Sequence, residues 1–279
     1  MRKIDSLAGQ PACLALTVLR KLGRYCRFAP QPPAHDVKRI LFVKMAEQGA
    51  TVLAYPAIHR AVEMVGRENV YFLVFEENRF ILDVMNVIPR ENVIAIPADS
   101  LAGVLRGALA AVFRMRKLRL DAAVDLEFFA RSSAALTYLS GAKVRVGLHR
   151  FADPAPYRGD LMTHRLKYDP GLHTARAFAA MVKAVQLDAE DLPQAAANLP
   201  SVRQEIPADE QSQPTFVPHA EELTRVRTEL RDLADSDDFR PLVLLNANAS
   251  DLLPLRRWPS ERYVEVARRL LVRSKEIRV

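Results

Sequence analysis

Short apolar runs that alternate with helical segments constrain the fold of this chain more than any other feature. Five runs read as strands: residues 38–44 (KRILFVK), 69–75 (NVYFLVF), 92–96 (NVIAI), 120–126 (LDAAVDL) and 142–147 (AKVRVG). Unbroken apolar runs of this length are typical of strands that are buried on both faces. Helical periodicity lies between them, most clearly over residues 101–118. The alternation predicts the α/β class, with a doubly wound parallel sheet.

The second half of the chain repeats the pattern only briefly. Residues 151–169 are irregular, 172–187 are helical, and the polar stretch that follows to residue 238 contains one helical segment, 220–233. A new strand is expected at 240–246, a helix at 259–272 and the start of a strand at 275–279. About 40 residues are too few for an independent α/β domain. We therefore expect the chain to end inside a second domain.

The net charge is concentrated near the N-terminus. The chain has a formal net charge of +7, and residues 1–39 hold eight Lys and Arg against two Asp. The remainder is nearly neutral, which argues against a nucleic-acid binder. A basic arm that is joined to an apolar stretch favours an anionic lipid surface as partner.

Residues 7–28 (LAGQPACLALTVLRKLGRYCRF) form this arm. The apolar part is much shorter than the roughly 20 residues that span a bilayer, and cations follow it directly. Leu14, Val18 and Leu22 recur at helical spacing, so residues 1–28 are predicted to be an amphipathic helix in the membrane interface. A secretory signal or short span, and an ordinary helix docked on the protein, are the alternatives. The Pro-rich residues 29–37 then act as a stiff linker.

Several enzyme classes are disfavoured by missing motifs. The sequence has no Gly-x-Gly-x-x-Gly fingerprint, no P-loop and no Gly-x-Ser-x-Gly elbow. Its six histidines show no metal-ligand spacing, and its two cysteines exclude a disulfide scaffold. No metal site is expected.

Three segments, taken together, resemble glycosyltransferase family 9. They are RILFVKMAEQGATVLAYPAIHRA, DLEFFARSSAALTYLSGAKVRVGLHR and LLNANASDLLPLRRWPSERYVEVARRLL, in that order along the chain. The family contains the ADP-heptose:lipopolysaccharide heptosyltransferases. The resemblance implies the GT-B architecture of two Rossmann-like lobes. Residues 38–190 would be the acceptor domain, 191–238 a connection between domains, and 239–279 the incomplete start of the nucleotide-sugar-binding domain.

The resemblance also implies the reaction. The protein would transfer a sugar, expected to be heptose from ADP-heptose, to a lipopolysaccharide core acceptor with inversion and without a cofactor. It would be peripheral on the cytoplasmic face of the bacterial inner membrane. The alternative is a truncated, inactive remnant that still binds membrane or acceptor.

The catalytic base is the weak point of the resemblance. Heptosyltransferases usually have Gly-Asp in the first loop, with the aspartate as proposed base, whereas Gly49 is followed here by Ala50. Glu47 lies on the same segment, and Glu127 follows the strand predicted at 120–126, so both are candidates for the base. Glu47 as a mere polar loop or cap residue, and the absence of any base from this chain, remain open.

Further site residues are expected at strand ends and helix starts. Ser250, Arg256 and Arg257 lie between a strand and a helix N-terminus, where backbone N–H groups favour the donor phosphates. A solvated arginine pair is the alternative there. The acceptor side is assigned to Gly49, Thr51, Arg131, Ser132, His149 and Arg150. Ser132 as only an N-cap, and His149 as a structural residue, are the alternatives.

Overall fold

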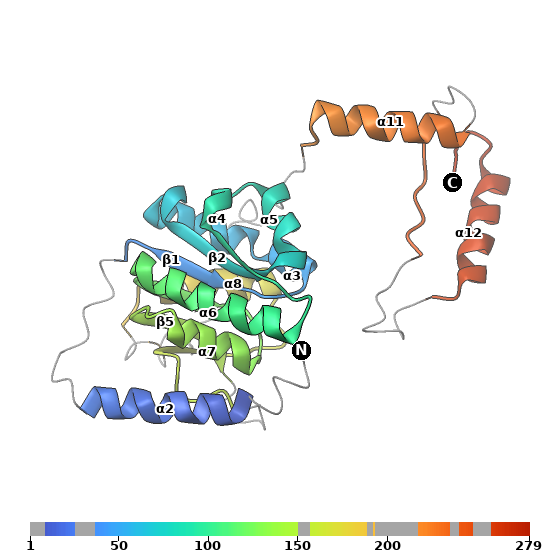
Figure 1. Ribbon diagram of the computed structural model, residues 1–279. Helices are drawn as coiled ribbons and strands as arrows, with labels where there is room; N and C mark the ends of the chain where they lie inside the picture. Colours follow the sequence, from blue (N-terminus) through green and yellow to red (C-terminus); the bar gives the residue numbers. More distant parts are fainter. Residues whose placement is uncertain are drawn as a thin grey trace. The chain divides into compact units, whose positions relative to one another are not determined.

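The computed structural model (Figure 1) describes residues 9–25, 37–149, 157–188, 192, 217–234, 240–247 and 258–279. The chain divides into two compact units, Met1–Phe216 and Val217–Val279. Each unit is described below on its own.

The first unit is built on a parallel sheet of six strands in the order β3-β2-β1-β4-β5-β6. Every neighbouring pair is parallel. The strands are β1 Ile40–Val43, β2 Val70–Phe75, β3 Val93–Ile96, β4 Ala122–Asp125, β5 Val144–His149 and β6 His164–Lys167. The predicted doubly wound parallel sheet is confirmed.

Helices cover both faces of this sheet, because the side chains of a strand point alternately to either face. Ile40 and Phe42 pack in one core with the helices α4 and α8, and Leu41 and Val43 pack in the other with α6. On the first side lie α3 Gln48–Leu53, α4 Tyr55–Val65, α5 Arg79–Met85 and α8 Thr174–Ala184. On the second side lie α6 Leu101–Leu118 and α7 Arg131–Leu139. Single 3-10 turns, Arg67–Asn69, Glu76–Asn78 and Arg90–Asn92, lead into or out of β2 and β3.

Helix α2, Gly9–Tyr25, docks against α7 through a mixed face that includes Cys13 and Leu16 as well as polar residues. Thr17 is buried, and its hydroxyl accepts a hydrogen bond from the Asp160 amide at 2.9 Å. The guanidinium of Arg20 pairs with the Asp160 carboxylate at 2.6 Å. Leu14, Val18 and Leu22 are exposed instead. A helix was predicted here, and no helix in the described ranges is long and apolar enough to cross a bilayer.

Two local predictions differ from the structure. The irregular stretch 151–169 contains β6, a strand that its polar sequence HRLK concealed. The helical segment after β1 is two helices, because the chain turns at Ala54 between α3 and α4. Gly49 therefore lies inside α3 and does not form a loop.

The second unit contains α11 Ala220–Ala234 and α12 Ser260–Arg273. Strands were predicted at 240–246 and 275–279, and the described residues there form one parallel bridge, Leu242 with Arg278. The amide of Val243 donates to the Arg278 carbonyl at 2.8 Å, and the amide of Arg278 donates to Pro241 at 2.9 Å. The sheet of the first unit contains no residue of this segment. The predicted linker 29–37 lies almost entirely outside the described residues.

Candidate functional site

The order in which the chain adds strands to the sheet reverses between β1 and β4. The chain runs from β1 outward to β2 and β3, and then returns to β4 on the other side of β1 before continuing to β5 and β6. Open parallel sheets bind ligands outside the carboxyl ends of the strands, at such a switch point. The segments that follow Val43 and Asp125 therefore flank the position where a ligand is expected, and Val43 and Asp125 are register partners.

A buried lysine joins the two predicted catalytic carboxylates at this edge. Lys44 follows β1 and is completely buried. Its Nζ lies 3.0 Å from Glu47 Oε2 and 3.2 Å from Glu127 Oε2. A buried ammonium needs such partners, because an isolated charge in the interior loses the solvation of water. The structure thus brings Glu47 and Glu127 together, although they are 80 residues apart in the sequence.

Glu127 also holds the segment after β1 in place. Its Oε1 accepts hydrogen bonds from the Met45 amide at 2.8 Å and the Ala46 amide at 3.3 Å. The side chain is only 15% exposed. With Oε1 and Oε2 both engaged, this carboxylate is suited to positioning the segment rather than to accepting a proton from a substrate.

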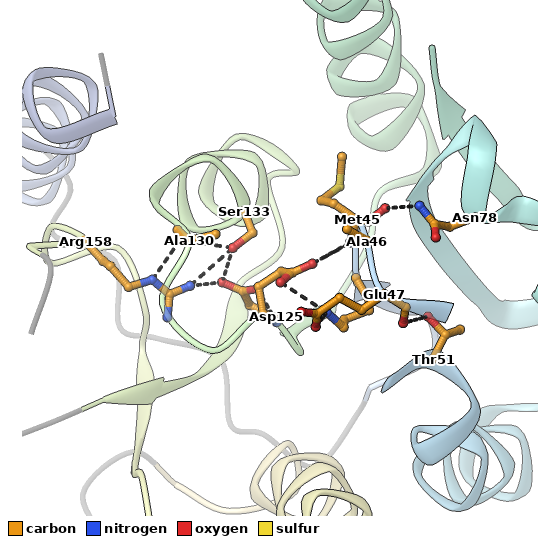
Figure 2. Close-up of polar contacts among 11 residues, drawn as sticks. Met45, Ala46, Glu47, Thr51, Asn78, Asp125, Ala130, Ser133 and Arg158 are labelled. Atoms are coloured by element: carbon orange, nitrogen blue, oxygen red, sulfur yellow. Dashed lines mark hydrogen bonds and ion pairs between the residues drawn. The ribbon is translucent and has the colours of Figure 1, made fainter. Parts of the chain in front are cut away.

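Glu47 is the accessible carboxylate of the pair (Figure 2). Its side chain is 61% exposed. Its backbone has φ 71° and ψ 84°, the left-handed region that a residue with a side chain rarely adopts. Strain of this kind is frequently found at functional sites. The Glu47 carbonyl accepts the Thr51 amide at 3.1 Å and the Thr51 hydroxyl at 3.4 Å, so α3 fixes the position of the residue.

A second, deeper charge pair lies at the end of β4 (Figure 2). Asp125 is completely buried; its Oδ2 accepts the Ser133 hydroxyl at 3.0 Å and pairs with Arg158. Burial raises the pKa of Asp125 to about 6, opposed by Arg158 and reinforced by the charge of Glu127. Asp125 Oδ1 also accepts the Glu127 amide at 3.1 Å. Asp125 thereby orients the segment that carries Glu127.

The residues predicted on the acceptor side are spread over several places. Thr51 is buried within α3, and Gly49 is exposed on the same helix. Arg131 opens α7 and donates to the Tyr157 carbonyl at 3.0 Å, and its side chain packs beside Gly9 of α2. Ser132 is exposed in the first turn of α7; the N-cap of that helix is Ala130, not Ser132.

His149 ends β5 at the same edge of the sheet as Glu47 and Glu127. Its pKa is lowered by partial burial, and further by the charges of Arg165 and Arg158. Arg150, predicted beside it, lies outside the described residues, as do the three donor-phosphate candidates Ser250, Arg256 and Arg257. Trp258 is described and stacks edge-on against Tyr263, with ring centroids 5.1 Å apart.

Four residues of the site were not predicted: Lys44, Asp125, Ser133 and Arg158. The signal for two of them was present, because Lys44 and Asp125 are charges inside or next to otherwise apolar strand runs. A buried charge generally requires a partner. Nothing in the spacing of the sequence identified Arg158 as that partner.

The site combines one accessible carboxylate, that of Glu47, with a group of buried charged side chains that support it. The exposed carboxylate of Glu47 is a group that could accept a proton from a hydroxyl brought to this edge of the sheet. The segment that carries Glu47 is held by Lys44 and Glu127. Glu127 is oriented in turn by Asp125, which pairs with Arg158. Across the ranges that the structure describes, no group of three or more His, Cys, Asp or Glu is arranged to hold a metal ion.

Solved structures with this fold include two glycosyltransferases. The glycosyl transferase family 9 protein of Veillonella parvula DSM 2008 matches with a TM-score of 0.58 and 16% identity, over 85% of this chain and 60% of that one. The E. coli heptosyltransferase WaaC with ADP matches with a TM-score of 0.53 and 18% identity, over 84% and 64%. The chain thus spans less than two thirds of the length of either protein.

No protein-family model matches the sequence, and no curated protein matches it significantly. The resemblance to family 9 that the three sequence segments indicated is confirmed at the level of the fold. The chain therefore shares the α/β fold of a solved family 9 glycosyltransferase and of a solved heptosyltransferase.

Proposed function

We propose that this chain belongs to a glycosyltransferase that moves a sugar from a nucleotide-sugar to a hydroxyl group. The observation that carries the proposal is the exposed carboxylate of Glu47, held at the β1/β4 switch point by buried Lys44 and by Glu127. The fold shared with two glycosyltransferases supports it. The first unit would bind the acceptor, and the second would belong to the donor-binding lobe.

In the proposed reaction, Glu47 acts as general base. Its carboxylate takes the proton of the acceptor hydroxyl while that oxygen bonds to the anomeric carbon of the sugar. The bond from this carbon to the diphosphate breaks, and the nucleoside diphosphate leaves with the electron pair. Attack from the opposite side inverts the anomeric configuration. Ser250, Arg256 and Arg257 are proposed to neutralise the departing diphosphate.

The substrates are proposed from the same likeness. One of the matched structures is a heptosyltransferase with ADP, so ADP-heptose is the proposed donor. A lipopolysaccharide core hydroxyl is the proposed acceptor, as the sequence resemblance to family 9 implies. No metal or cofactor takes part in the step as written. Residues 1–28 would hold the protein to the cytoplasmic face of the inner membrane, where a lipid-linked acceptor is found.

The natural gene product tests this proposal with a panel of nucleotide-sugars. Incubation of ADP-heptose with heptose-deficient lipopolysaccharide should release ADP and add one heptose to the acceptor, as read by mass spectrometry. UDP-glucose and GDP-mannose serve as matched donors that should transfer far more slowly. Absence of transfer from every nucleotide-sugar, with a folded protein, would contradict the proposal and favour an inactive remnant.

A further inference from the structure

Helix α6 carries an apolar stripe on the side that faces away from the sheet of the first unit. Leu101, Leu105, Leu109 and Phe113 follow one another at intervals of four residues, so they lie along one face of the helix. They are 55 to 76% exposed. The opposite face of α6 is already packed against the sheet through Ala111 and Met115. The stripe therefore takes no part in packing the core of the first unit, and it is available to contact a partner outside that unit.

The ionisable side chains that α6 itself carries are all cationic. Arg106, Arg114, Arg116 and Lys117 are the ionisable residues of α6, which has no Asp or Glu. The neighbouring helices α7 and α2 have no Asp or Glu either. An apolar stripe with cations beside it is the arrangement of helices that lie in the interface of an anionic membrane. Arg114 and Arg116 also donate to the backbone carbonyls of Glu91, Val93 and Leu139. Anionic headgroups would neutralise the cations that remain at the surface.

Helix α2 presents a similar surface in the same layer. Leu14, Val18, Leu19 and Leu22 are 50 to 60% exposed, while Thr17 and Arg20 face the protein. Cys13 and Leu16 also face the protein and pack in its core, so the exposed leucines and Val18 are apolar surface beyond what docking of the helix uses. Helices α2 and α6 both contact α7, and the three lie side by side in Figure 1. Two outward apolar stripes thus flank α7.

We propose that the α6 stripe is a second membrane contact, which inserts into the headgroup–acyl boundary of an anionic bilayer together with α2. A second copy of the chain fits the surface less well, because a symmetric dimer would bring the cations of α6 and α2 against those of the partner without any acidic residue in these helices to offset them. Two contacts on one layer would also fix how the first unit is oriented on the surface. The proposal depends on the exposed stripes and not on sugar transfer.

Vesicle binding by the natural gene product tests the proposal. Phosphatidylcholine vesicles with and without phosphatidylglycerol are used to compare the wild type with the double variant Leu109→Asn, Phe113→Asn, which removes apolar surface and leaves the charge unchanged. We expect the partition coefficient on the anionic vesicles to fall at least about tenfold. The matched control is Phe80→Asn, an exposed phenylalanine on α5, in the opposite helix layer, which should bind as the wild type does.

A depth measurement separates lipid insertion from a general loss of fold. The sequence has one tryptophan, so Phe113→Trp in a Trp258→Phe background gives a single probe on α6. Its emission should shift to the blue on anionic vesicles and be quenched by bromine-labelled acyl chains. Unchanged binding by the double variant would overturn the proposal. So would a fluorescence signal from the Phe113→Trp probe that never responds to vesicles, or a concentration-dependent dimer that the double variant converts to monomer.

Discussion

Replacing Glu127 by glutamine should destabilise the first unit, because this carboxylate holds the segment after β1. The substitution keeps the shape of the side chain and removes the charge that pairs with buried Lys44 at 3.2 Å. It also weakens the two hydrogen bonds from Met45 and Ala46, since bonds to a charged acceptor contribute about 1.5–3 kcal/mol. Breaking a fully buried pair costs about 3–5 kcal/mol.

The expected loss is smaller than that upper figure. Glutamine can still accept one amide hydrogen, and Lys44 keeps Glu47 as a partner at 3.0 Å. We expect the free energy of unfolding to fall by about 2–3 kcal/mol, which corresponds to a decrease in Tm of roughly 4–12 °C for a unit of this size. Urea titration and thermal melting followed by circular dichroism measure both quantities.

Glu47→Gln is the matched control for this prediction. Its carboxylate contacts the same ammonium but is 61% exposed, so the pair is screened by water. Exposed ion pairs contribute at most about 1 kcal/mol. The reasoning fails if Glu127→Gln melts within about 2 °C of the wild type, or if Glu47→Gln loses as much stability as Glu127→Gln.

Two further predictions concern pH and helix packing. Burial raises the pKa of Asp125 from 3.8 to about 6, so the folded state retains this proton more firmly. The contribution of this proton to the free energy of unfolding is complete below pH 3.8 and is lost as the pH rises through 6, by about 3 kcal/mol in total. Asp125→Asn should abolish this pH dependence of the free energy of unfolding, as measured by urea titration. A slope that persists in the variant would assign it to another group. Gly49→Ala should raise stability by about 0.5 kcal/mol, because the added Cβ meets no atom within 4 Å. Gly107→Ala should lower it, since its Cβ would lie 2.7 Å from Pro97 Cδ; equal effects from the two would contradict the packing argument.

The strands of the sheet were predictable because burial on both faces requires unbroken apolar runs. Residues such as Phe42 and Phe72 are completely buried, and their neighbours in the sequence are apolar too. β6 was missed for the converse reason, since an edge strand with His164, Arg165 and Lys167 has no apolar run to reveal it. The pattern of apolar residues in a sequence indicates which segments are buried, and it does not indicate which segments pair as strands.

The candidate site was predictable in part for the same reason. Glu47 and Glu127 follow strand runs, and the rule for parallel sheets places them at one edge. The contact through Lys44 joins segments that are about 80 residues apart, and that of Asp125 with Arg158 joins segments 33 residues apart. Such pairings depend on strand order, which local sequence patterns do not specify. The inward turn of Thr17 and Arg20 in α2 likewise depends on Asp160, far along the chain.

The turnover of Glu47→Gln in the natural gene product tests the central claim most directly. Steady-state transfer from the nucleotide-sugar is measured for the wild type, Glu47→Gln and Glu127→Gln at a temperature where all three are folded. If Glu47 is the base, Glu47→Gln should lower kcat by about 10²-fold or more and leave the KM for the donor unchanged. A kcat that stays within about twofold of the wild type would contradict the assignment of Glu47 as the base.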